Sequence, residues 1–327
     1  MKSTMIFGLM VLCGSIFAAE VDTFTARFEY FEDISSVVNR KANESIKAAV
    51  AKTQSLSECT SEKSEKVLYK ELRKFFANHT KGKFLIDLLH SDEVFKRITP
   101  SLDSIYSEWE PLDGQSLGGI FGFRRKLPLS PLVKFFDRFI GIDKFEHMFG
   151  MGRRYFLNYY FKGHSLEKVL KRGIFGEKFI LGGSMMGTGV FSFGDLSANF
   201  NGMRFWNHML QRRDDVLGSE YNVGPYILCE NNKFVVNTIN PVDFNNYVDP
   251  SMDESINCPK FATKRAVRKY KRALKELGVT CPMSKADLEI AVKKYSVKTS
   301  SDEKSKSISH WILNTGIVED VSYFNEF

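Results

Sequence analysis

The sequence predicts a mainly α-helical protein, a helical bundle with a small β-hairpin and a disulfide-stapled C-terminal region. Three observations predict this class: apolar residues recur every three or four positions through most of the chain, one pair of short β-prone runs flanks a polar turn, and two cysteines flank a predicted helix. Hydrophobic content of 43% and charged content of 26% are ordinary for a globular protein of 327 residues, which excludes global disorder. The 29 Phe residues predict a bulky aromatic core.

Residues 1–18 have the features of a secretory signal peptide. Lys2 precedes an apolar run too short to cross a bilayer as a helix, and a cleavage site follows Ala18. The alternatives are an uncleaved anchor and a lipoprotein modified at Cys13, which is disfavoured because a bulky residue precedes that cysteine. No later stretch is long and apolar enough to predict a membrane-spanning helix. We therefore expect an exported protein, periplasmic or extracellular, that is soluble and makes at most peripheral contact with a membrane.

The cysteine pattern predicts disulfides. Cleavage of the leader leaves four cysteines, an even number in an oxidising compartment. Cys258 and Cys281 are the closest pair in the sequence, so we expect a bridge between them, although three connectivities are open. The other two are Cys59 and Cys229, and none of the spacings resembles a zinc site.

The net charge of +7 and the pI of about 9.0 predict attraction to anions. We interpret the Lys and Arg residues as spread along the chain, with no basic stripe interleaved with aromatics. Nucleic acid is therefore not an expected partner of this exported chain. Loose attraction to an anionic envelope surface is the simpler explanation, and a component of the cell envelope is the expected partner.

The N-terminal region, residues 19–130, is expected to hold helices followed by a loop rich in Gly and Pro. Apolar periodicity predicts helices and one or two further turns over residues 23–54, 65–78, 84–89 and 92–98. Residues 99–130 read as a long loop. The sequence favours a structural wrap over a functional loop and does not decide whether residues 111–130 cover a site.

Residues 131–217 are expected to form a helical core. The predicted helices cover residues 131–140, 143–161, 165–181 and 193–212, and Ser165 is a predicted N-cap. Gly150, Gly152 and Gly202 lie inside these helical patterns, where Gly costs stability compared with Ala. We expect them where a second helix or a ligand comes close.

Residues 218–295 are expected to hold a β-hairpin and C-terminal helices. Residues 226–229 and 234–236 flank a polar turn and predict the hairpin. Apolar periodicity predicts helices at 262–277 and 284–295, the second beginning at the N-cap Ser284. Residues 296–327 are interpreted as a polar linker and tail.

Polar residues recur at helical spacing within the core region. Asp143 and His147 are four residues apart, as are Asp195 and Asn199, so each pair shares one face of a helix. Aromatic neighbours indicate that these faces point inward, where a carboxylate must be paired, hydrogen-bonded, protonated or metal-bound. Glu177 lies on the helix between the two pairs.

Three interpretations of this polar set remain open. The first is a structural network in which His147 pairs with a carboxylate. The second is a divalent metal site, the one cofactor the set suggests, with His147, Glu177 and Asp195 as ligands and Asn199 behind them. The third is an acid–base pair involving His147, with Lys144 or Arg154 holding an anionic substrate.

The order of these residues resembles that of the VanZ-like family and related predicted periplasmic proteins. The matching elements are Asp143-Lys144-Phe-Glu-His147, then Glu177, then Asp195-Leu-Ser-Ala198-Asn199-Phe-Asn-Gly202. Members of that family look like membrane-embedded helical proteins of the cell envelope, whereas this chain carries long flanking regions and no predicted spans after its leader. The resemblance implies that Asp143, His147, Glu177, Asp195 and Asn199 meet in one helical core.

Other candidate sites are weaker. Asp249, Asp253 and Glu254 form an acidic cluster beside Cys258, for which a solvated, disulfide-anchored loop is favoured over a Ca²⁺ site because the EF-hand pattern is absent. His164 and His208 have no local partner pattern, and neither is given a role. The sequence also lacks a Gly-x-Ser-x-Gly elbow, a His-Glu-x-x-His motif, a phosphate-binding Gly loop and a dinucleotide fingerprint.

Two functions are consistent with this sequence. The first is a non-catalytic cell-envelope protein, structural or binding, whose polar core is a hydrogen-bond network. The second is an envelope hydrolase or ligand-binding protein that uses His147, Glu177 and Asp195, with or without a metal.

Overall fold

The computed structural model describes residues 19–114, 127–183 and 187–315. Helices predominate in these ranges, and three two-stranded antiparallel sheets accompany them, so the prediction of a mainly α-helical protein is confirmed only in part. The predicted leader and most of the predicted loop at 111–130 lie outside the described residues.

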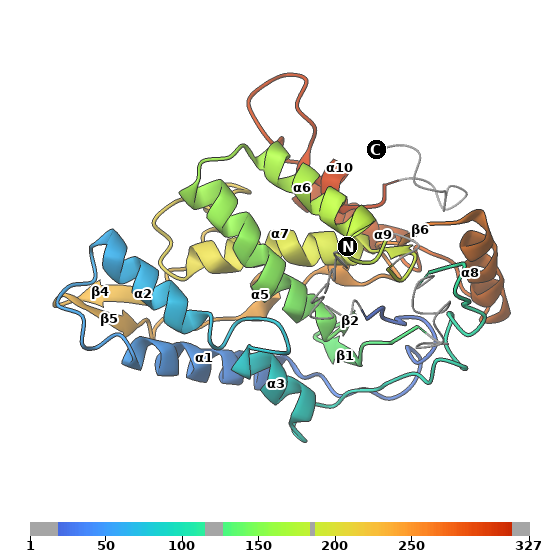
Figure 1. Ribbon diagram of the computed structural model, residues 1–327, viewed down its shortest axis with the longest axis horizontal. Helices are drawn as coiled ribbons and strands as arrows, with labels where there is room; N and C mark the ends of the chain where they lie inside the picture. The colour runs from blue at the N-terminus through green and yellow to red at the C-terminus, as the bar shows by residue number, and fades with distance from the viewer. Residues whose placement is uncertain (1–18, 115–126, 184–186, 316–327) are drawn as a thin grey trace, which may run out of the picture.

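Two helices from the predicted core region cross at the centre of the molecule (Figure 1). These are α5, Asp143–Phe156, which continues as a π-helical turn over Leu157–Phe161, and α7, Phe193–His208. Every residue of α7 except Asp195 is buried. Between them in sequence comes α6, Leu166–Phe179, which lies on the rim of the molecule beside the short α10, Ile308–Ile312 (Figure 1).

The N-terminal helices cover one side of this centre. They are α1, Ser35–Ala51; α2, Glu62–Leu72; and α3, Lys83–His90. Next to α1 lies the hairpin of β4, Ile227–Glu230, and β5, Lys233–Val236, in the predicted place (Figure 1). The predicted abundance of buried aromatics is present: Phe76, Phe149, Phe205 and Phe244 are fully buried, and their ring centroids lie 5.1–6.0 Å apart in several of the pairings.

The C-terminal helices begin at or within two residues of the predicted positions. They are α8, Lys264–Glu276, at the far end of the molecule, and α9, Lys285–Lys294 (Figure 1). Ser284 caps α9 by accepting the Asp287 N–H, and Ser165 caps α6 in the same way. The smallest sheet joins β3, Val190–Phe191, to β6, Lys260–Phe261. Both disulfides are present, Cys258–Cys281 as predicted and Cys59–Cys229.

The predicted helix at residues 131–140 is wrong. This segment is a hairpin of β1, Leu132–Phe135, and β2, Arg138–Gly141, and Phe136 takes a positive φ of 53° in its turn. Its apolar spacing fits a helix as well as a strand, which periodicity cannot separate in a short run. Contacts with the segment before α1 decide the outcome, since Asp33 accepts the Phe136 N–H and Ile34 N–H donates to the Lys134 carbonyl.

The first helix begins later than predicted. Residues 24–29 form turns, because the Asp22 carboxylate accepts the backbone N–H groups of Phe24 and Thr25 and competes with helical hydrogen bonding. Asp33 accepts the Ser35 N–H at the start of α1. Of the predicted range 23–54, the helix therefore covers residues 35–51.

Candidate functional site

Close packing of α5 on α7 brings the polar side chains of the two helices together. A Cβ atom on Gly152 would lie 2.6 Å from the Gly202 Cα, and one on Gly202 would lie 2.1 Å from the Met148 carbonyl oxygen. The two glycines thus let the helix backbones touch, as the sequence predicts for these positions. Gly150 has no atom within 4 Å of its hypothetical Cβ, so close packing does not explain it.

The centre of the cluster is the ammonium group of Lys144, on the first turn of α5. Its Nζ lies 2.7 Å from Asp143 Oδ2, 2.7 Å from Asp195 Oδ1 and 2.8 Å from Glu254 Oε1. The Lys144 side chain is 1% exposed. Three carboxylates, from α5, α7 and the loop after residue 252, thus converge on one buried cation and compensate its desolvation.

Asp195 links Lys144 to His147. Its second oxygen, Oδ2, lies 3.1 Å from His147 Nε2, and His147 Nδ1 lies 3.2 Å from Asn199 Oδ1. The two pairs that share helix faces in the sequence therefore contact each other across the α5–α7 interface. His147 and Asp195 keep 15% and 13% of their side-chain surface exposed, so they form the more open edge of the cluster.

Ser192 joins the N-terminus of α7 to the same cluster. Its hydroxyl caps the helix by accepting the Asp195 N–H at 3.0 Å, and it donates to Glu254 Oε1 at 2.6 Å. The positive end of the helix dipole also faces these carboxylates.

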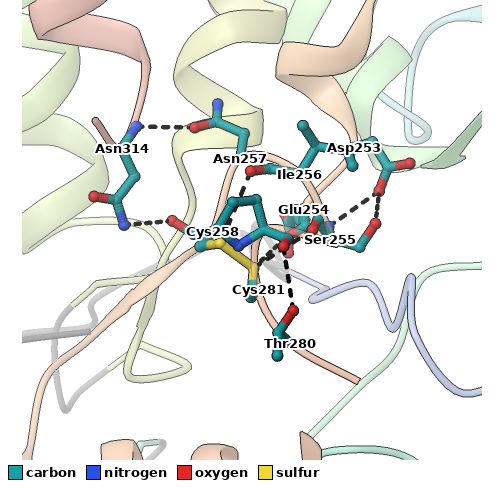
Figure 2. Close-up of a disulfide and its surroundings, with 10 residues drawn as sticks. Asp253, Glu254, Ser255, Ile256, Asn257, Cys258, Thr280, Cys281 and Asn314 are labelled. Carbon is teal, nitrogen blue, oxygen red and sulfur yellow. Dashed lines mark hydrogen bonds between the residues drawn. A yellow bond between two sulfur atoms is a disulfide. The ribbon is translucent and has the colours of Figure 1, made fainter. Parts of the chain in front are cut away.

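Glu254 lies on a loop that the Cys258–Cys281 disulfide ties to the segment before α9 (Figure 2). Within this loop the Asp253 carboxylate accepts the Ser255 N–H and hydroxyl at 3.0 and 2.7 Å. Asn314 contacts the end of the loop through two hydrogen bonds of 2.9 Å (Figure 2). Its backbone N–H donates to the Asn257 side-chain oxygen, and its side-chain amide donates to the Cys258 carbonyl.

The predicted solvated acidic loop at these positions is wrong. Asp253 and Glu254 are buried, and each acid of the set is matched to a different cation. Asp253 lies 2.8 Å from Arg27 Nη1, and Asp249 lies 2.6 Å from Lys294 Nζ. Because these carboxylates point to separate partners, they do not form a shared Ca²⁺ site.

Glu177 lies behind the centre, on α6. Its Oε1 accepts the Ser192 N–H at 3.5 Å, and Oε2 has no hydrogen-bond partner among the described residues. Burial, followed by the negative charge of Asp195, raises the pKa of Glu177 to about 8. Burial similarly raises the pKa of Glu20, whose carboxylate accepts the Thr188 hydroxyl. Glu177 is therefore mostly protonated near neutral pH.

Lys144, His147 and Asp195 are held charged. Burial opposes the charge on Lys144, but the surrounding carboxylates outweigh it and raise the Lys144 pKa well above its usual range. Burial opposes the charge on His147 as well, and Asp195 overcomes it, raising the pKa of His147 to about 9. In return, His147 and Lys144 hold the pKa of Asp195 well below its usual range, although burial acts the other way. At neutral pH neither Lys144 nor His147 is a free base.

Three side chains of the cluster could share a metal ion. Within the described ranges, Asp143, His147 and Asp195 each offer a donor atom within 4.8 Å of the others. This group differs from the predicted ligands in one member, because Asp143 takes the place of Glu177. The Lys144 ammonium group, 2.7 Å from oxygens of both aspartates, would repel a cation bound there.

The remaining candidates lie elsewhere. Arg154 is exposed, outside the cluster, and its Nη1 contacts Met151 Sδ at 3.6 Å. His208 belongs to a separate buried network at the other end of α7, with Nδ1 2.8 Å from the Tyr247 hydroxyl and Nε2 2.9 Å from Asp215 Oδ2.

Sequence reasoning missed Glu20, Ser192 and Glu254 as members of the cluster. Ser192 precedes a predicted helix by one residue, so an N-cap search could have found it. No local pattern links the two glutamates to the core helices, from which both are far in sequence. Comparison with known proteins gave no match to this chain among protein-family models, curated proteins or solved structures.

Proposed function

We propose that this chain is an exported cell-envelope protein with a structural or binding role, and that its buried charged cluster is an ion network that holds the fold together. The environment of Lys144 carries the proposal. Its ammonium group lies between three carboxylates and supplies the positive charge that compensates them. His147 is also held protonated by Asp195, so neither Lys144 nor His147 offers a free base for hydrolysis at neutral pH.

Export is supported by covalent structure as well as by the leader features of residues 1–18. Two disulfides link the described residues, and such bonds persist in oxidising compartments. None of the described helices is long and apolar enough to cross a membrane. The periplasm or the extracellular space is the compartment we propose, with an envelope component as partner.

The VanZ-like resemblance is part of the proposal. The motif residues Asp143, His147, Asp195 and Asn199 contact one another or Lys144, and Glu177 interacts electrostatically with His147 and Asp195. This grouping supports a shared helical core with that family. It supports no reaction.

A second candidate function is divalent-metal binding at Asp143, His147 and Asp195. The specific observation in its favour is the clustering of the three donors at the more open edge of the network. A metal bound there would displace the proton of His147 and add charge beside Lys144.

Elemental analysis of the purified protein, combined with thermal unfolding with and without EDTA, separates the two candidates. The ion network predicts far less than one metal per chain and no effect of EDTA on Tm. Nearly one metal per chain, lost in Asp195→Asn but kept in the matched control Asp87→Asn on α3, would replace the first proposal with the second. A metal at about a thousand times its Kd adds about 4 kcal/mol of stability, so EDTA would then lower Tm by several degrees.

A further inference from the structure

The outer face of α6 exposes aromatic side chains to solvent. Phe175 and Phe179 are 57% and 55% exposed, and Ile180, just after the helix, is 68% exposed. The rings of Phe175 and Phe179 lie 4.9 Å apart and form one apolar patch. The opposite face of the helix is packed into the core through Leu166, Val169, Leu170 and Ile174. An exposed patch of this kind, away from the hydrophobic core, indicates an interaction surface.

Basic side chains lie on the same face, one to two turns towards the N-terminus. Lys168, Lys171 and Arg172 line an open depression of about 530 Å³, together with Ser165, Glu167 and Phe175. Glu167 pairs with Lys171 at 2.6 Å, so three cations and one acid leave the depression with a net positive charge. Phe175 belongs to both the depression and the apolar patch, which makes the two continuous.

We propose that this face of α6 docks on an anionic lipid membrane. Lys168 and Arg172 would contact lipid phosphates, while Phe175, Phe179 and Ile180 enter the boundary between headgroups and acyl chains. A helix with cations and aromatics on its outward face is suited to lie in that interface. The inference rests on the proposed envelope location and names the membrane surface as the partner.

Helix α8 separates the effect of basic charge alone from the effect of cations combined with aromatic side chains, as on α6. Seven of its thirteen residues are Lys or Arg, so the basic residues are more clustered than the sequence interpretation assumed. Lys264, Arg268, Lys271 and Lys275 are exposed. They recur at intervals of four, three and four residues, which places them on one face, but no exposed aromatic residue lies among them. This helix therefore supplies a charge-matched control.

Co-sedimentation of the purified full chain with vesicles tests the proposal. The vesicles contain phosphatidylcholine alone or phosphatidylcholine mixed with phosphatidylglycerol. We expect binding to the mixed vesicles only, weakened by added salt. Each cation near an anionic surface contributes about fivefold in affinity, so Lys168→Glu with Arg172→Glu should weaken binding at least about twentyfold. Phe175→Ser with Phe179→Ser should weaken it about tenfold or more.

Two controls change other surfaces. Arg268→Glu with Lys275→Glu on α8 alters net charge equally, and Ile239→Ser removes an apolar side chain that is 95% exposed in the segment after β5. Both should bind within about threefold of the parent. All variants share one N-terminus, so differences among them report the substituted surface.

Three results would overturn the proposal: no binding of the parent to mixed vesicles, equal losses from the α8 and α6 charge variants, or unchanged binding by the Phe variant. A different result would assign the depression to free phosphate instead. In that case inorganic phosphate would abolish binding of the parent to the vesicles, and the Phe variant would bind them normally. Metal content and EDTA sensitivity of the same preparation test the ion network separately, so the two proposals can fail independently.

Discussion

Lys144 is the residue on which the buried cluster depends, because one ammonium group neutralises carboxylates from three parts of the chain. Asp143 comes from its own helix, Asp195 from α7 and Glu254 from a loop 110 residues further on. Removing one partner of a buried ion network leaves the other charges without compensation. The cost of losing Lys144 should therefore far exceed that of losing an ordinary surface ion pair.

We expect Lys144→Met to lower the free energy of unfolding by about 3–5 kcal/mol. The matched control is Lys41→Met, which removes a lysine from a pair with the half-exposed Asp87 and should cost at most about 1 kcal/mol. Urea denaturation monitored by circular dichroism measures both. Equal, small losses in the two variants would contradict the central role of Lys144.

Glu177 makes stability depend on pH with a defined sign. Its folded-state pKa of about 8 lies above the ordinary value of 4.5, so the folded state binds more protons than the unfolded state between those values. Stability from this group is fully present below pH 4.5 and is lost as the pH rises to 8. His147, with a folded-state pKa of about 9 against 6.5, adds a loss in the same direction between those values.

Glu177→Gln should flatten this profile. An amide resembles the protonated carboxyl in shape and cannot ionise, so the variant should gain stability relative to the parent from pH 5 to pH 8, by at most about 1.4 kcal/mol per pH unit. Guanidinium denaturation at a series of pH values measures the difference. Glu167→Gln, on the outer side of the same helix, is the matched control for the loss of one carboxylate. Parallel profiles for Glu177→Gln and the parent would show that Glu177 is ionised in the fold.

Among the helical glycines, Gly202 of α7 is required by close packing, whereas Gly150 of α5 is not. Gly202→Ala would place a Cβ 2.1 Å from the Met148 carbonyl oxygen, so the helices must move apart at a cost of about 1–3 kcal/mol. Gly150→Ala meets nothing within 4 Å and should instead stabilise the helix by up to about 1 kcal/mol. Thermal unfolding of the two variants should therefore shift in opposite directions. Destabilisation by Gly150→Ala would indicate a contact of another kind at that position.

Helices were predictable where the apolar spacing extended over several turns. The described α5, α6 and α7 all fall within predicted ranges, and the caps at Ser165 and Ser284 follow from local hydrogen bonding alone. The segment at 131–140 was not predictable, because its ten residues fit both periods and its pairing depends on Asp33 and Ile34, about 100 residues away. Tertiary contacts, which no local pattern records, decided that element.

Over the whole molecule, the part of the site that lies on two helices was predictable and the rest was not. Four-residue spacing paired Asp143 with His147 and Asp195 with Asn199, and the apolar residues around them indicated inward-facing sides. The resemblance to the VanZ-like family implied that the two pairs meet. Glu254 joins them only because the chain folds back through the loop beside Cys258. The sequence indicated the disulfide but not which face of its loop is buried, so a buried acid was interpreted as a solvated one.

The Cys258–Cys281 bridge should therefore do more than restrict the unfolded chain. It closes a short loop with a sequence separation of 23 residues, for which chain entropy predicts about 3 kcal/mol, whereas Cys59–Cys229, with a separation of 170, predicts about 5 kcal/mol. If the shorter bridge also positions Glu254, its loss should weaken the contact between Glu254 and Lys144. Stability and site geometry would then be coupled through one covalent bond.

A double-mutant cycle tests this coupling. Glu254→Gln should cost about 2 kcal/mol or more in the parent, because it removes a buried partner of Lys144 and Ser192. In a background of Cys258→Ser with Cys281→Ser, the same change should cost at least about 1 kcal/mol less, and in a background of Cys59→Ser with Cys229→Ser it should keep its full cost. Urea denaturation of the six proteins gives both comparisons. An equal cost of Glu254→Gln in all three backgrounds would show that hydrogen bonds of the loop, including those from Asn314, position Glu254 without the bridge.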